Sequence, residues 1–226
     1  SLRKASGWSE ITQQTIEDDI FYFYELKLRT LSELEKDDQP DIIKLNHELI
    51  AIAKKWKEKE KIFPIMDANS NIVWYFFNTA NYSKYKSSSL EGFNIGKSFL
   101  EEDDFSYFSA PKDAKLLLLK KTGRFLVHHT ELVCTPTKED RVKCIEFHKS
   151  IEDYITENYD SVLSSSESYG FEHLRTTYTT LSDQYYHIND FDSSIKYFIK
   201  DLNLIKHYKD SIIKRKEEVA VISHLI

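Results

Sequence analysis

Residues 62–77 read IFPIMDANSNIVWYFF, and this stretch decides the fold that the sequence predicts. Two largely apolar runs, 62–66 and 72–78, lie on either side of the polar segment Asn69-Ser70-Asn71. Short runs rich in β-branched and aromatic residues, separated by a turn signal, are typical of a β-hairpin. We therefore expect a strand, a turn and a second strand at this point in the chain.

Two more turn signals extend this pattern downstream. Gly123, which tolerates a positive φ, lies between two further apolar runs. Another turn is expected between Cys134 and Cys144. The sequence thus predicts five antiparallel strands, at 62–66, 72–78, 115–120, 125–134 and 142–150. Residues 79–113 are expected to form short helices and loops that cross over the sheet. Leu116–Leu119 also fits a buried helical turn, because a short apolar run does not fix its own period.

Both flanks of this central block repeat their apolar residues at helical spacing. Two upstream stripes predict an antiparallel helical hairpin, and they consist of Ile16, Ile20, Tyr24, Leu28, Leu31 and Leu34, and of Ile42, Leu45, Leu49, Ile52 and Trp56. Two downstream stripes predict a second helix pair, and they consist of Leu174, Tyr178, Leu181, Tyr185 and Ile188, and of Phe191, Ile195, Phe198, Leu202 and Ile205. Asn189-Asp190 turns the chain between the downstream stripes, Ser164–Ser168 is a linker candidate, and a last helix is expected from about Ser211.

These patterns predict an α+β fold in three parts. They are an N-terminal helical hairpin (1–61), a small antiparallel five-stranded sheet with a helical crossover (62–152) and a C-terminal helical hairpin or bundle (153–226). The 226 residues are enough to bury a core. Only 5 Gly and 4 Pro occur among them, which favours long helices over loop-rich folds. The chain opens on Ser1-Leu2 without an initiator methionine, which is typical of a piece of a longer protein.

The first expected strand ends in a recognisable motif, Ile65-Met66-Asp67-Ala68-Asn69, with Asn71 close behind. Preceded by a helical hairpin and followed by a crossover and three strands, this motif resembles PAS-like sensor domains, and most of all their Cache relatives. In those domains a long helix precedes a strand that ends in Asp, and Gly usually stands near the place of Asn71. The resemblance covers roughly residues 10–150. It implies a ligand-sensing or dimerising domain of a signalling protein.

A PAS-like fold implies a pocket between the sheet and the 79–113 crossover. The candidate lining residues are Trp74, Phe76, Tyr82, Tyr85, Leu117, Val127 and His129. The alternative for each of them is an ordinary place in the core, since buried apolar side chains need no ligand to explain them.

A second resemblance lies in residues 175–208, where several side chains fall at the spacing of the helix-pair positions of a tetratricopeptide repeat. They are Tyr178, Leu181, Ser182, Tyr185, Phe191, Ser194, Phe198 and Asp201. Ser182, Ser194 and Asp201 stand where that family usually has Gly or Ala. The resemblance implies a helical scaffold that binds a partner protein or peptide. Because one copy is too few for a stable solenoid, an ordinary helical hairpin is the alternative.

The charge pattern argues against a chain-wide nucleic-acid surface. The net charge is −6, with 31 Lys and Arg against 37 Asp and Glu of mixed order, whereas a nucleic-acid surface needs a basic face. Even the most basic stretch, Lys54–Lys61, interleaves acidic residues and fits a solvated helix face. No apolar run approaches the roughly 18–20 residues of a transmembrane helix, and no signal peptide is visible. The compartment is therefore left open.

No catalytic motif accompanies the predicted sheet. The chain lacks a His-Glu-x-x-His helix motif, a Gly-rich phosphate loop and a Gly-x-Ser-x-Gly elbow. Cys134 and Cys144 would face each other across the last hairpin, where either a disulfide or two buried free thiols satisfies the pattern. His128 and His148 would share that face, but zinc needs three or four converging ligands. We predict neither a metal nor another cofactor.

The function expected from the sequence is a non-enzymatic ligand-sensing or interaction module of a signalling protein. Its partner would be a small-molecule ligand or another protein, and a homodimer is compatible with this interpretation. The alternative is an all-helical, repeat-like scaffold that binds a partner protein or peptide. The third hypothesis is an enzyme whose residues converge only in the fold.

Overall fold

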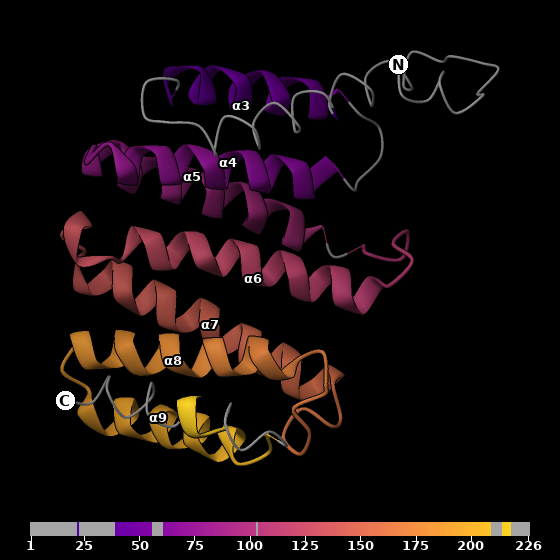
Figure 1. Cartoon of the computed structure of the whole chain (residues 1–226), viewed down its shortest axis with the longest axis vertical. Helices are drawn as coiled ribbons and strands as arrows, with labels where there is room; N and C mark the ends of the chain where they lie inside the picture. The colour runs from indigo at the N-terminus through magenta and orange to yellow at the C-terminus, as the bar shows by residue number, and fades with distance from the viewer. Residues whose placement is uncertain (1–21, 23–38, 56–60, 103, 209–213, 218–226) are drawn as a thin grey trace. The chain divides into compact units, whose positions relative to one another are not determined.

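The computed structural model describes residues 22, 39–55, 61–102, 104–208 and 214–217, and it shows helices joined by short connections (Figure 1). The elements in chain order are α3 (Gln39–Ala53), α4 (Ile62–Asn78), α5 (Tyr82–Glu101), α6 (Pro111–His129), the short 3₁₀-helix η3 (Leu132–Cys134), α7 (Lys138–Asn158), α8 (Phe171–His187) and α9 (Phe191–Ile205). No strand occurs among these described residues. The predicted α+β fold with a five-stranded antiparallel sheet is therefore wrong, and the described fold is all-α.

The expected hairpin at 62–78 is one helix, α4. Its buried residues recur at helical spacing, and they include Ile62, Ile65, Met66, Asn69, Ile72 and Val73. Pro64 is the third residue of α4, in the first turn, where a helix makes no use of the backbone N–H. Asn69 makes no turn, because its side-chain amide donates to the Ile65 carbonyl oxygen at 2.8 Å.

The strands expected at 115–120 and 125–134 are wrong as well, because α6 continues through Gly123. A Cβ atom added to Gly123 would lie 2.9 Å from Cδ1 of Ile151 and 3.2 Å from Nε2 of His148, both on α7. This glycine therefore serves the close approach of two helices, and the expected hairpin turn is absent.

The strand expected at 142–150 lies inside α7, so the turn expected between the cysteines is the connection from α6 to α7. Thr137 starts α7 with a reciprocal capping box, in which its hydroxyl accepts from the Asp140 N–H and the Asp140 carboxylate accepts from the Thr137 N–H. The short helices and loops predicted for the 79–113 crossover are also wrong, because most of this segment forms one 20-residue helix, α5.

The predicted helix pair in the C-terminal part is confirmed by α8 and α9. Asn189 takes a left-handed φ of 64° between them, and the Asp190 carboxylate accepts from the Ser193 N–H at 3.1 Å to cap α9. The helix expected from Ile42 is confirmed by α3. The helix expected over Ile16–Leu34, and most of the one expected from Ser211, fall outside the described residues.

The chain divides into two compact units, one ending at residue 103 and the other beginning at residue 104. In the first unit α3 packs on α4 and α4 on α5. The α3–α4 interface is apolar and contains Leu45, Leu49, Ile65, Ala68 and Ile72. In the second unit α6 packs on α7, α7 on α8 and α8 on α9. Within each unit the main packing therefore joins helices that are consecutive in the chain.

Replacing Gly123 by Leu is expected to lower the free energy of unfolding by about 1–3 kcal/mol, because the larger side chain overpacks the α6–α7 crossing. Gly123→Ala should cost less, since a gain in helix propensity of about 1 kcal/mol offsets part of the crowding. Arg124→Leu, at an exposed neighbouring position, is the matched control. Urea unfolding of the three variants measures the effect, and a Gly123→Leu protein as stable as the wild type would contradict the close approach.

Candidate functional site

The residues predicted to line a pocket are divided between the two units. Tyr85 is buried, whereas Trp74 and Tyr82 are exposed. The ring centroids of Tyr85 and Tyr82 lie 5.3 Å and 6.4 Å from that of Phe77, so both tyrosines pack around one phenylalanine at the α4–α5 turn. Without a sheet among the described residues, the pocket expected between sheet and crossover has no counterpart there.

The candidates of the second unit lie on α6. Leu117 and Val127 are partly buried and His129 is buried. The Nε2 atom of His129 lies 3.2 Å from Oδ1 of Asp140, the same aspartate that caps α7. This histidine therefore helps to hold the α6–α7 connection.

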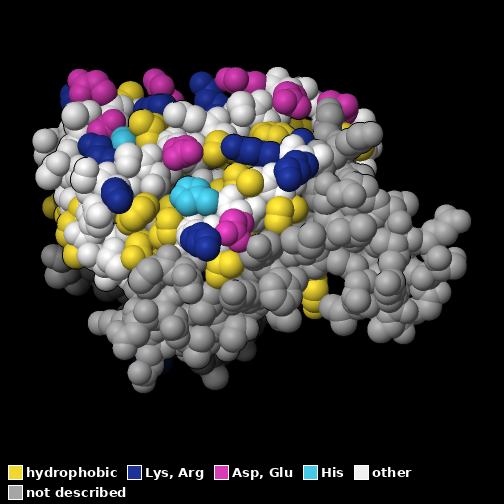
Figure 2. Space-filling model, turned by 90° about the horizontal axis from the view of Figure 1, so that it is seen from above, with side chains coloured by type: hydrophobic (Ala, Val, Ile, Leu, Met, Phe, Trp, Pro, Cys, Tyr) yellow, Lys and Arg dark blue, Asp and Glu magenta, His cyan; other side chains and the backbone are white. Residues whose placement is uncertain are grey.

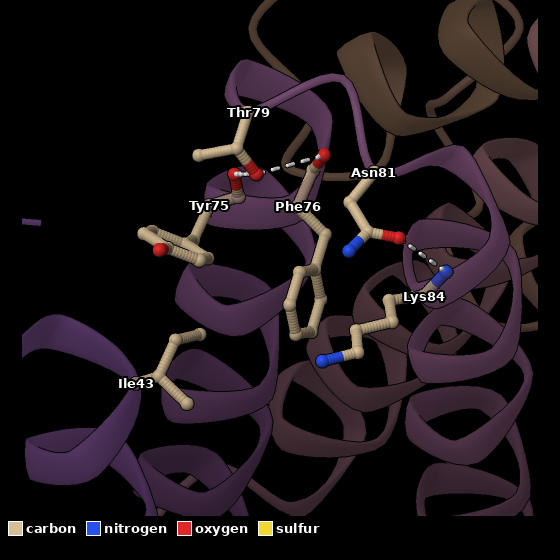
Figure 3. A pocket seen from close by; sticks show the side chains of 6 residues that line it. All are labelled: Ile43, Tyr75, Phe76, Thr79, Asn81 and Lys84. Atoms are coloured by element: carbon tan, nitrogen blue, oxygen red, sulfur yellow. Dashed lines mark hydrogen bonds between the residues drawn. The ribbon is translucent and has the colours of Figure 1, made fainter. Parts of the chain in front are cut away.

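A hollow of about 410 Å³ lies where α4 turns into α5 (Figure 3). It is lined by Ile43, Tyr75, Phe76, Thr79, Asn81 and Lys84, so Phe76 is the pocket candidate that contributes to it. Its polar groups already serve the helix ends: Thr79 Oγ1 donates to the Tyr75 carbonyl oxygen at 2.9 Å, and Asn81 Oδ1 accepts from the Lys84 N–H at 3.3 Å. The Lys84 amine lies 5.3 Å from the centre of the Phe76 ring. These contacts give the hollow a structural role.

Cys144 and His148 form a buried pair on α7, with Sγ 3.6 Å from Nδ1. The Nδ1–H of His148 also lies 2.9 Å from the Cys144 carbonyl oxygen, to which it donates. Burial raises the pKa of the Cys144 thiol to about 12 and lowers the pKa of His148 to about 4. Both groups are therefore neutral at pH 7, which is the opposite of an activated cysteine nucleophile.

Cys134 and Cys144 are both buried free thiols. Because the predicted hairpin does not form, they do not face each other across a pair of strands. Burial also lowers the pKa of His128, although Glu131 at 2.9 Å opposes the shift. Within the described ranges, no group of three or more His, Cys, Asp or Glu side chains is placed to hold a metal ion.

The most distinctive surface is a row of apolar side chains on α9. Phe191, Ile195 and Ile199 follow one another four residues apart and are 51%, 49% and 49% exposed. Tyr186, near the end of α8, is exposed beside them, and its ring centroid lies 5.6 Å from that of Phe191. We call Phe191, Ile195 and Ile199 the α9 stripe.

The α9 stripe is exposed because α9 packs on α8 through another face. Its buried residues are Ser194, Tyr197, Phe198, Asp201, Leu204 and Ile205. The helices approach closely where small residues meet, and Ser182 Oγ of α8 donates to the Ser194 carbonyl oxygen at 2.9 Å. Figure 1 shows the two helices side by side.

A buried ion pair fixes α9 to α8. The Nε atom of Arg175 lies 2.9 Å from Oδ1 of Asp201, and both side chains are almost fully buried. Arg175 also donates to the Tyr208 hydroxyl at 2.8 Å and to Glu217 at 3.2 Å. Thr179 Oγ1 donates to the second carboxylate oxygen of Asp201 at 3.2 Å. Arg175 and Thr179 together therefore satisfy both oxygens of the buried carboxylate.

A second polar contact fixes α9 to α7. The Tyr197 hydroxyl donates to one Glu152 carboxylate oxygen at 3.1 Å, and the Lys200 amine lies 2.5 Å from the other. Burial first, and Glu152 next, raise the pKa of Tyr197 above its ordinary value, so its hydroxyl keeps its proton. The α9 stripe is thus carried by a helix anchored on two neighbours.

The charges of the described surface are mixed. On the face drawn in Figure 2, Lys and Arg side chains lie among Asp and Glu side chains, with hydrophobic groups scattered between them. None of the helices that the structure describes is long and apolar enough to cross a membrane.

No protein-family model matches this chain, and neither does any curated protein sequence. 

Sequence reasoning placed Phe191 and Ile195 on α9 but missed that they are exposed. The signal that it passed over is Ile199, which lies beside the predicted stripe of Phe191, Ile195 and Phe198. This extra isoleucine widens the apolar arc of α9 beyond what one neighbouring helix covers.

Proposed function

We propose that this chain is a non-enzymatic interaction module, a helical scaffold that binds a partner protein through the α9 stripe. The observation that carries the proposal is the row of half-exposed Phe191, Ile195 and Ile199 on a well-anchored helix. Single exposed apolar residues are ordinary, whereas a contiguous apolar row typically marks an interaction surface.

The spacing of the α9 stripe favours a helical or extended apolar partner segment. Residues four apart lie on the same face of a helix, and helical partners recognise each other through such apolar faces. Tyr186 extends the same surface with an aromatic ring, a side chain that is enriched among interface hot spots. The anchors on α7 and α8 keep the surface rigid, which lowers the entropic cost of binding.

The resemblance to a tetratricopeptide repeat supports this proposal. Ser182 and Ser194 stand where that family usually has Gly or Ala, and they meet at the α8–α9 crossing. Small side chains at these two places allow the same close approach. The packing of each helix on its neighbour in the chain is also what a repeat-like scaffold needs.

Two observations disfavour the other hypotheses. The ligand-sensing hypothesis relied on a pocket over a sheet, and the described residues contain no strand. The enzyme hypothesis needs accessible groups of suitable pKa, whereas the Cys144–His148 pair is neutral and buried.

The Ile195→Glu/Ile199→Glu protein is expected to bind its partner at least about tenfold more weakly, because two central apolar contacts are lost and two charges are introduced. The full chain serves as bait in an extract of the source cells, each captured protein is identified and purified, and its affinity for both forms is measured. Thr176→Glu/Lys196→Glu, which adds two glutamates at exposed positions outside the row of the stripe, is the control. Equal affinity of the stripe and control variants would contradict the proposal.

A further inference from the structure

The hollow at the α4–α5 turn has a rim that the backbone holds in place. The Asn81 N–H donates to the Phe76 carbonyl oxygen at 2.9 Å, and the Ala80 N–H donates to the Phe77 carbonyl oxygen at 3.0 Å. Ala80 itself takes a left-handed φ of 55°. These two bonds around a left-handed residue form the Schellman motif, which closes the end of a helix. The hollow of about 410 Å³ is therefore formed by the fold before any ligand arrives.

Two nitrogen donors at this rim have no protein acceptor. Asn81 Oδ1 accepts from the Lys84 backbone N–H, so the amide nitrogen of Asn81 is the end that faces away from α5. Figure 3 shows this nitrogen turned toward the Phe76 side of the hollow. The Lys84 amine lies 5.3 Å from the centre of the Phe76 ring. Within the part of the chain that the structure describes, neither nitrogen donates to an acceptor, and no carboxylate pairs with Lys84.

The wall beside these donors is mainly apolar. It consists of Ile43 from α3 and of Tyr75 and Phe76 from α4, all of them partly buried. An apolar wall with a few converging polar groups is the usual make-up of a small-molecule site. An ammonium and an amide N–H at one end suit a carboxylate, whose two oxygens accept hydrogen bonds and whose charge the ammonium balances. The volume lies near the lower end of the roughly 300–1,000 Å³ of ligand pockets, so the ligand is small.

We propose that this hollow binds a small free carboxylic acid with an aromatic body, as its carboxylate. The ring packs against the apolar wall, and the carboxylate accepts from the Lys84 amine and from the Asn81 amide. Lys84 and Asn81 are exposed, so water competes with the ligand and binding is weak. The inference goes beyond the proposed function and does not depend on it, because the hollow belongs to the first unit and the α9 stripe to the second.

An NMR titration of the full chain tests this site, with hydrocinnamate as the probe and hydrocinnamide as its neutral counterpart. Hydrocinnamate is expected to shift the backbone amide signals of residues 76–84 saturably, with a Kd of about 1 mM. Hydrocinnamide should bind at least about fivefold more weakly. Lys84→Met should raise the Kd of hydrocinnamate at least about fivefold and leave that of hydrocinnamide unchanged. Lys97→Met, at an exposed position about 20 Å further along α5, is the matched control and should bind like the wild type.

Asn81→Asp is the second variant, because aspartate keeps the oxygen that caps α5 and replaces the amide donor by a negative charge. It should be as stable as the wild type and lose hydrocinnamate binding. The absence of a saturable shift in the wild type, equal Kd values for the acid and its amide, or an unchanged Kd in Lys84→Met would each overturn the proposal. An acetylated tripeptide that ends in phenylalanine tests the other source of such a carboxylate. Tighter binding of this peptide than of hydrocinnamate would assign the hollow to a polypeptide C-terminus and overturn its assignment to a small acid, whereas weaker binding supports that assignment.

Discussion

Asp201→Ala is expected to lower the free energy of unfolding by about 3–5 kcal/mol, the largest effect of any single change considered for this protein. The substitution leaves the buried guanidinium of Arg175 without the carboxylate that lies 2.9 Å from its Nε atom. It also removes the acceptor of Thr179 Oγ1. Glu217 at 3.2 Å and Glu172 at 3.7 Å remain beside the guanidinium, but both carboxylates are far more exposed than Asp201 and replace only part of the lost pairing. Urea unfolding of the full chain measures the difference.

A double-mutant cycle identifies the cause of that loss. Arg175→Met/Asp201→Leu replaces both charges by apolar groups, so it should lose markedly less stability than the sum of Arg175→Met and Asp201→Leu, and it should be more stable than Asp201→Leu alone. Tyr208 and Glu217, which lose Arg175 in the double variant, are partly exposed and can be hydrated instead. Asp192→Ala, an exposed position on the same helix, should stay within about 0.5 kcal/mol of the wild type. A double variant as unstable as the sum of its single changes would show that packing, and not the unpaired charge, dominates.

The contrast between residues 62–77 and α9 shows what sequence periodicity can predict. In α9 the stripe of Phe191, Ile195, Phe198, Leu202 and Ile205 follows spacings of four and three over the whole helix, which strand alternation does not produce. Residues 62–77 satisfy two periods at once: Ile62, Pro64 and Met66 alternate, whereas Ile62, Ile65 and Met66 lie on one helical face. Period alone therefore could not separate strand from helix in this stretch.

Two residues that are common in turns, Asn69 and Gly123, led the sequence prediction to a sheet. Asn69 lies in an Asn-Ser-Asn segment typical of turns, but it is buried in α4 and bonds the carbonyl oxygen four residues before it. Gly123 is a frequent turn residue, but here it makes room for Ile151 and His148 of α7. In both cases tertiary packing overrides the local preference. That packing is visible only when the neighbouring helix is in place.

The candidate site was harder to predict than the helices, for a related reason. Periodicity shows that Phe191 and Ile195 share a face, yet exposure depends on which face α8 covers. The cover is set by the Ser182–Ser194 contact and by the Arg175–Asp201 pair, which join residues distant in sequence. The pocket residues were chosen on the assumption that a sheet would bring them together. In the all-α structure they lie in two separate helical units.

His148 links the same packing to pH. Its imidazole is buried on α7 and lies against Gly123 of α6. Its Nδ1–H donates to the Cys144 carbonyl oxygen. Burial lowers its pKa in the folded chain to about 4, against an ordinary value of 6.5. A basic group whose pKa is depressed by folding contributes stability that is fully present above pH 6.5 and is lost as the pH falls toward 4.

The wild type is therefore expected to lose about 3 kcal/mol of unfolding free energy between pH 7 and pH 4 relative to His148→Asn, at about 1.4 kcal/mol per pH unit between the two pKa values. Asparagine keeps the backbone contact, since Asn46, Asn69 and Asn158 of this chain each donate to the carbonyl oxygen four residues before them. Its smaller side chain should make the variant about 1 kcal/mol less stable at pH 7, so the two stability curves are expected to cross as the pH falls. Urea unfolding at half-unit pH steps measures them, with the exposed His47→Asn as control. Parallel curves would mean that His148 titrates alike in the folded and unfolded chain, and that the imidazole is not held in a dry α6–α7 interface.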